Sequence, residues 1–123
     1  MSKICTSLEQ SKKLIELGVD INTADMAYWK RSYQPNDYAI MVHHTKELQE
    51  GFEAKCIEYI PAWSLSALFK MLPCSARLER GSSTELYHVT LPDELKSSDW
   101  YIEPVDAAFE MVCWLKKRRI YLI

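Results

Sequence analysis

The segment PVDAAFEMVCWLKKRR, residues 104–119, decides the fold that this sequence predicts. From its second residue to Leu115 only Asp106 and Glu110 are polar, so the segment is apolar around most of its circumference. A helix of this kind is usually buried between two layers of a domain. The proline at its start suits a first helical position, and the four cations at its end suit the negative end of a helix dipole. We therefore expect the central helix of the fold here. The large side chains that it should contribute to the core are Phe109, Val112 and Trp114.

A second helix is predicted within IPAWSLSALFKMLP, residues 60–73, which has a proline near each end. Ser64 is a favourable N-cap residue, and Trp63 before it can pack onto Leu68 one turn later. Pro73 ends the helix because its ring disfavours a helical conformation in the residue before it. Leucine and phenylalanine recur at helical spacing, which is more typical of a core than of a cofactor site.

A third helix is expected closer to the N-terminus. Thr6 and Glu9 have the spacing of a capping box, and Gly18 suits the position just after a helix. Apolar and charged residues between them fall on opposite faces, which is typical of an amphipathic surface helix.

Two segments have the pattern of β-hairpins. Residues 26–33 and 37–44 are rich in aromatic and β-branched side chains and flank a Pro-Asn turn. Residues 76–91 repeat this pattern around the turn GSS. The segment CIEYI, residues 56–60, could add one further strand, whereas residues 45–55 are polar and suit a short helical turn or a loop.

The order helix, hairpin, helix, hairpin, helix predicts an α+β fold. In this fold a small antiparallel sheet, built from the two β-hairpins, is packed with about three α-helices. A chain of 123 residues fits one compact domain, so residues 1–123 are expected to form a single domain.

Composition limits the classes of partner. Fifteen basic and seventeen acidic residues give a net charge of −2, so no overall attraction to nucleic acid or to an anionic membrane is expected. The apolar runs are shorter than a membrane span, and the start of the chain lacks the apolar region of a signal peptide. A cytoplasmic location is the expectation.

The four cysteines contain no CxxC pair, so most are expected to be reduced and buried.

Three carboxylates are the sharpest candidates for chemistry. Glu103, Asp106 and Glu110 lie on one face if the last helix extends that far, and such spacing can hold a hard metal or divide acid and base roles. Asp106 and Glu110, with His88, are therefore the catalytic candidates for a small metal-dependent or hydrolytic enzyme. The alternative is a solvent-facing stripe on a buried helix. No metal ligand set is identified, and no nucleotide-binding loop occurs, so no cofactor is expected.

One basic cluster could contact phosphates. It closes the last predicted helix and consists of Lys116, Lys117, Arg118 and Arg119. Nucleic-acid binding through these residues, with nearby aromatic rings stacking on bases, is a further alternative. Their position at a helix C-terminus is by itself a sufficient structural reason for four cations.

The first predicted hairpin is unusually aromatic. It carries Tyr28, Trp29, Tyr33 and Tyr38. Alternate residues of a strand face outward, and exposed aromatics are typical of interaction surfaces. The alternative is cross-strand pairing that only stabilises the sheet. Since no catalytic set is recognisable, the leading hypothesis is a non-enzymatic protein that binds another protein, or a second copy of itself, through this hairpin.

Three segments carry a resemblance to a known family. They read SLEQSKKLIELGVDINTADM, PAWSLSALFKMLP and PVDAAFEMVCWL. Together they resemble a family of small uncharacterised proteins encoded by phages and mobile elements of gut bacteria. The resemblance spans most of the chain, with the hairpins differing more. It implies an accessory, intracellular role and transfers no activity and no catalytic residue.

Overall fold

The computed structural model describes residues 3–30 and 38–122, with side chains through Arg118 at the C-terminal end. In chain order the elements are α1 (Leu8–Glu16), η1 (Ile21–Thr23), β1 (Met26–Lys30), β2 (Ala39–Met41), α2 (Lys46–Ala54), β3 (Glu58–Ala62), α3 (Leu65–Lys70), β4 (Arg77–Arg80), β5 (Tyr87–Leu91), η2 (Pro92–Glu94), β6 (Lys96–Ser97) and α4 (Pro104–Leu122). The predicted α+β class is confirmed, with both sheets antiparallel.

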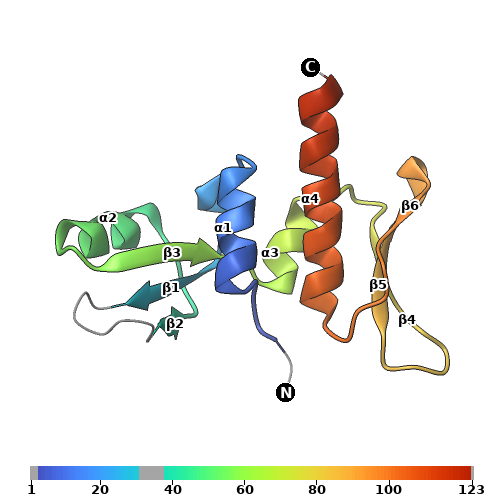
Figure 1. The fold of residues 1–123 in the computed structure, drawn as a ribbon, viewed down its shortest axis with the longest axis horizontal. Coiled ribbons are helices and arrows are strands. Elements are labelled where there is room, and N and C mark those ends of the chain that lie inside the picture. Colours follow the sequence, from blue (N-terminus) through green and yellow to red (C-terminus); the bar gives the residue numbers. More distant parts are fainter. Residues whose placement is uncertain (1–2, 31–37, 123) are drawn as a thin grey trace.

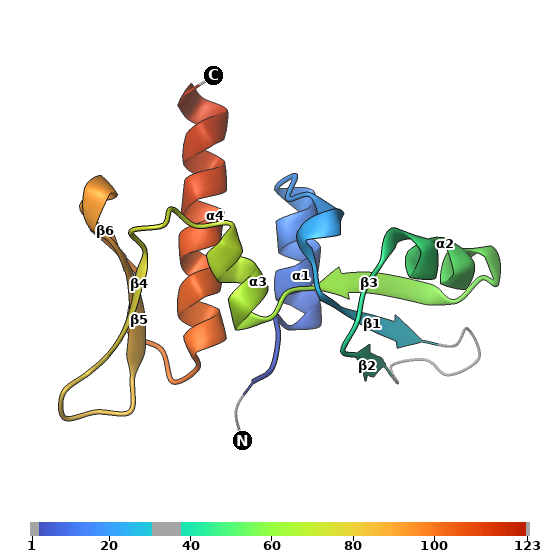
Figure 2. The ribbon, with the colours of Figure 1, turned by 180° about the vertical axis from the view of Figure 1, so that it is seen from behind.

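The molecule is elongated, with a three-stranded sheet toward each end and helices between the sheets (Figure 1). From the first sheet the order is α1, α3, α4 and then the second sheet, and the view from behind shows the same order (Figure 2). The two hairpins were expected to form one sheet, but they lie in two separate sheets. Each pairs instead with a third strand of its own, because the helices separate the two hairpins.

The first sheet has the order β2-β1-β3, and α2 packs against it. The strand predicted in CIEYI is thus present as β3, shifted toward the C-terminus. The segment considered a helical turn or a loop is a nine-residue helix, because Thr45 caps it by accepting a hydrogen bond from the Leu48 N–H at 3.1 Å. Trp29 of β1 and Tyr59 of β3 both pack on Phe52 of this helix, with ring centroids 5.6 and 5.4 Å apart.

The second sheet has the order β4-β5-β6, and α4 covers one of its faces. Val89 and Leu91 of β5 are buried in the cluster that contains α4, so the alternate residues of this strand face away from the helix. A single bridge between Tyr87 and Tyr101 holds the segment before α4 against the same strand.

The main core forms around α4, as the sequence predicted for its central helix. Ala107 and Ala108 are fully buried and let α3 and β5 approach closely, and Met111 fills the space beyond them. Val112 is buried as expected, whereas Phe109 and Trp114 are only partly buried, at the margin of the cluster. Two of the three large side chains expected in the core thus lie at its margin, and alanines of α4 are buried in it.

The N-terminal helix begins one residue later than predicted. Ser7 is its N-cap and forms a capping box with Gln10. Thr6 does not cap because its hydroxyl is buried, bonded to the Ser11 hydroxyl at 2.8 Å and accepting the Trp63 N–H at 3.1 Å. Gly18 follows the helix with φ of +88°, a conformation that glycine adopts without a steric penalty.

None of the four cysteines forms a disulfide, and two of them are buried. Cys5 and Cys113 are buried, while Cys56 and Cys74 are exposed, so the expectation that most are buried is only half right. Burial raises the pKa of the Cys113 thiol to about 11, which keeps it protonated and unreactive.

In the part of the chain that the structure describes, no helix combines the length and the apolar character that crossing a membrane requires.

Candidate functional site

The predicted acidic stripe forms a polar seam that holds other segments onto α4. Asp106 Oδ1 accepts hydrogen bonds from the Lys3 ammonium at 2.7 Å and from the Gln10 side-chain amide at 2.9 Å. Glu103 Oε2 accepts the backbone N–H of Lys3 at 2.9 Å. These two carboxylates thus attach the N-terminal segment and α1 to the first turn of α4.

Glu110 continues the seam on the other side. Its Oε1 accepts the Tyr101 hydroxyl at 2.6 Å and the Asp99 N–H at 3.2 Å, and the first of these bonds is the main reason why the pKa of Tyr101 is raised. Within residues 3–30 and 38–122, no three His, Cys, Asp or Glu side chains gather as a group that could hold a metal. The structure also separates His88 from Asp106 and Glu110, because the backbone of β5 lies between them.

The predicted basic cluster is divided among different contacts. The Arg118 guanidinium pairs with Glu94 and lies over the Trp114 ring, 5.0 Å from its centroid. Lys116 lines a small cavity between η1, α3 and α4, and Lys117 is exposed. The side chain of Arg119 lies outside the described residues. The three described cations therefore do not form one continuous free surface.

The aromatic residues that the structure describes in the first hairpin make contacts within the molecule. Trp29 lies under α2, and the Tyr28 hydroxyl donates to the carbonyl of Thr6 at 2.9 Å. Tyr38 packs edge-on against Tyr28, with ring centroids 6.5 Å apart, and donates its hydroxyl to Glu58 at 2.8 Å. All three are partly buried, and Trp29 packs on a helix, not on a neighbouring strand. Tyr33, the fourth aromatic of the prediction, lies outside the described residues.

A different aromatic residue is presented outward, on the second sheet. Trp100 is 48% exposed, and its ring stacks on the His88 imidazole with centroids 3.8 Å apart and planes 10° apart. The imidazole Nε2 is 3.7 Å from Glu79 Oε1, and the Thr90 hydroxyl donates to the same oxygen at 3.2 Å. These four residues form what we call the outer face of the second sheet, opposite α4.

Strand register explains how this face is assembled. Tyr87 bridges Tyr101, and Tyr101 points toward Glu110 on α4. Their neighbours His88 and Trp100 therefore point together to the opposite side. The turn after β4 also lies close to the Trp100 ring. A Cβ added at Gly81 would be 3.5 Å from a carbon of that ring.

Trp100 was not predicted as a site residue, because its segment WYIE, residues 100–103, was assigned to neither hairpin. Alternation along WYIE alone would place Trp100 and Ile102 opposite Tyr101, and both are indeed exposed. Only the bridge to Tyr87 shows which side of this segment is covered by α4.

No protein-family model, curated protein sequence or solved structure matches this chain.

Proposed function

We propose that this protein is a non-enzymatic binding module for another protein, and that the contact is centred on Trp100 in the outer face of the second sheet. The single observation that carries this proposal is a large aromatic ring, about half exposed, that is held in place by a stacked imidazole. This surface takes the place of the first hairpin, whose described aromatics have intramolecular contacts.

The stacking matters because it reduces the entropy lost on binding. Tryptophan is among the residues that most often dominate interface energies, and its contribution is largest where its rotamer is already fixed. The exposed part of the Trp100 ring is on the order of 100 Å², and its burial would contribute about 2 to 3 kcal/mol.

Polar groups lie on the same face as the ring, and polar residues are typical of the rim of protein interfaces. The register pairs Arg77 with Thr90 and Glu79 with His88, so all four share the face with Trp100. Arg77 is exposed and has no side-chain partner among the residues that the structure describes. Arginine is also frequent in the energetic centres of interfaces.

The test compares two exposed apolar residues on different sheets. Trp100→Ala removes the proposed contact, and Ile40→Ala is the matched control because Ile40 is 46% exposed on the first sheet. Each tagged protein is used to capture partners from nuclease-treated lysate of the native host. The captured partner is then purified and titrated with the wild-type protein and both variants, and their melting temperatures are compared.

We expect the wild-type protein to capture one stoichiometric partner. The dissociation constant for this partner should rise by about tenfold or more with Trp100→Ala and stay unchanged with Ile40→Ala. Equal affinity of the Trp100→Ala variant and the wild-type protein would contradict this site. Capture of no partner would contradict the function itself.

A further inference from the structure

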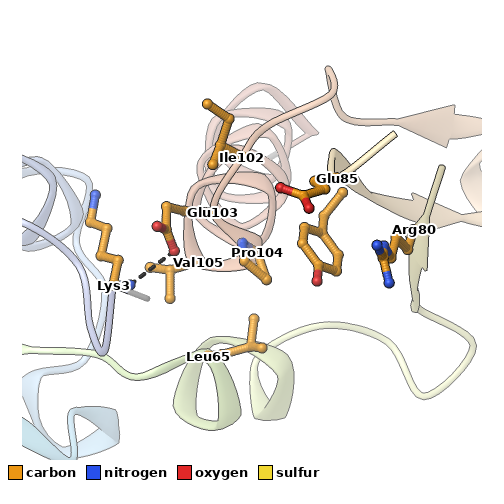
Figure 3. A pocket seen from close by; sticks show the side chains of 9 residues that line it. Lys3, Leu65, Arg80, Glu85, Ile102, Glu103, Pro104 and Val105 are labelled. Atoms are coloured by element: carbon orange, nitrogen blue, oxygen red, sulfur yellow. Dashed lines mark hydrogen bonds between the residues drawn. The ribbon is translucent and has the colours of Figure 1, made fainter. Parts of the chain in front are cut away.

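A groove of about 490 Å³ opens beside the first turn of α4, where the β4–β5 hairpin extends beyond the helix (Figure 3). Val89 and Leu91 lie buried beneath α4, but Tyr87, earlier in the same strand, lies at the helix start and lines the groove. Binding sites for small molecules have volumes of about 300 to 1,000 Å³, so the groove is large enough for one.

The wall formed by the hairpin carries two opposite charges. Arg80 and Glu85 both line the groove, on the side across from Pro104 and Val105 (Figure 3). Neither side chain has a hydrogen-bond or ion-pair partner within the described part of the chain. Both groups are thus available to a ligand that carries a negative and a positive group.

The opposite wall adds negative charge. Glu103 lies there and accepts the backbone N–H of Lys3 (Figure 3). The Lys3 ammonium extends away from the groove to Asp106 and Gln10. The groove therefore holds one unpaired cation, Arg80, and two carboxylates. A ligand that carries both a carboxylate and an ammonium group matches these charges better than a ligand that carries only a carboxylate.

Apolar side chains complete the groove. Leu65 of α3 points into it from one side, Ile102 lies across from it on the α4 side, and Val105 lies between them (Figure 3). Ile102 is 74% exposed. An apolar ligand side chain resting here would remove this surface from water.

We infer that this groove binds a free amino acid with an aliphatic side chain. Its carboxylate pairs with the Arg80 guanidinium, its ammonium group with the Glu85 carboxylate, and its side chain packs on Leu65 and Ile102. Arginine recognises carboxylates through two parallel hydrogen bonds, which makes this contact geometrically selective. A peptide terminus offers only one of the two charges on one residue, whereas a free amino acid offers both. This site is separate from the outer face of the second sheet and goes beyond protein binding.

The test uses L-leucine, N-acetyl-L-leucine and L-leucine amide, titrated into the full chain and followed by amide chemical shifts. L-leucine should give saturable shifts at the groove residues. Each capped form should bind about tenfold or more weakly, since it lacks one charge-assisted contact. Binding by the acetylated form as tight as by L-leucine would contradict the role of the ammonium group and favour a peptide C-terminus.

Substitutions of groove residues are compared with a matched substitution on β4 that lies outside the groove. Arg80→Gln and Glu85→Gln should each weaken L-leucine binding by about tenfold. Arg77→Gln should leave it unchanged, because Arg77 lies on the same strand but faces away from α4. Trp100→Ala should also leave it unchanged, which separates this test from that of the proposed function. Absence of saturable shifts with L-leucine, or equal losses with Arg80→Gln and Arg77→Gln, would overturn the inference.

Discussion

The ring of Trp100 lies flat on the imidazole of His88, at a centroid separation of 3.8 Å and an angle of 10°. These residues are far enough apart in the sequence that their contact depends on the Tyr87–Tyr101 bridge. The imidazole covers one face of the indole while Trp100 remains 48% exposed, so a change at His88 should alter the proposed contact between Trp100 and a partner.

Replacing His88 by alanine should weaken partner binding while leaving the domain folded. Without the imidazole the indole can adopt more rotamers, and ordering a side chain on binding costs about 0.5 to 1.5 kcal/mol. His88→Phe should restore affinity because a phenyl ring can stack in the same place. Titration of the captured partner measures both effects, with His43→Ala, an exposed residue of the first sheet region, as the control. Equal affinity of the alanine variant and the wild-type protein would show that stacking is irrelevant to binding.

Replacing Asp106 by asparagine should lower the free energy of unfolding by about 1 to 2 kcal/mol. The change weakens the bonds from Lys3 and Gln10, which are 2.7 and 2.9 Å long, and removes a negative charge from the first turn of α4. Chemical denaturation measures the loss. Glu50→Gln is the control, since Glu50 is exposed within α2 and has no side-chain partner among the described residues. A loss no larger than that of the control would mean that the seam adds nothing to stability.

Acidification should destabilise the first sheet through His44. Burial lowers the pKa of His44 below its ordinary value of 6.5, and its Nδ1 is 2.7 Å from the Tyr59 hydroxyl. The unfolded chain therefore binds this proton more tightly than the folded one, and stability should fall as the pH drops below 6.5.

Unfolding measured from about pH 7.5 to about pH 5.5 checks this, with His44→Gln as the comparison. The variant should lose less stability than the wild-type protein over this interval. Parallel pH dependence of the two proteins would show that another group is responsible.

Replacing Trp63 by phenylalanine should destabilise the protein by about 1 to 3 kcal/mol. Trp63 is fully buried, and its indole N–H donates to the Thr23 hydroxyl at 2.9 Å, so the substitution leaves a cavity and removes this bond. Trp100→Phe, the same change on the surface, should stay within about 0.5 kcal/mol. Thermal and chemical unfolding measure both variants, and similar losses would contradict the placement of Trp63 in the core.

Several elements could be predicted from the sequence because their signals are local. Ser64 caps α3 through its own hydroxyl, Pro104 stands at the start of α4, and Gly18 follows α1, as predicted. Both hairpins were recognisable from alternation and turn residues within a few positions. The α+β class follows from the order of these elements.

What the sequence left open depends on contacts between distant residues. The carboxylate of Asp106 was recognised, but its partner Lys3 lies 103 residues away, so a catalytic stripe and a structural seam could not be told apart. The alternation of β1 assigned Tyr28 and Trp29 to opposite faces, but both side chains proved to be partly buried, Trp29 against α2 and Tyr28 against the N-terminal segment.

The sequence by itself thus determined the helices α1, α3 and α4, both hairpins and the two possible faces of each strand, because caps, turns and periodicity act over a few residues. Only the tertiary structure decided which face remains exposed, because burial depends on which distant element packs there. Trp29 packs against α2, whereas Trp100 remains exposed.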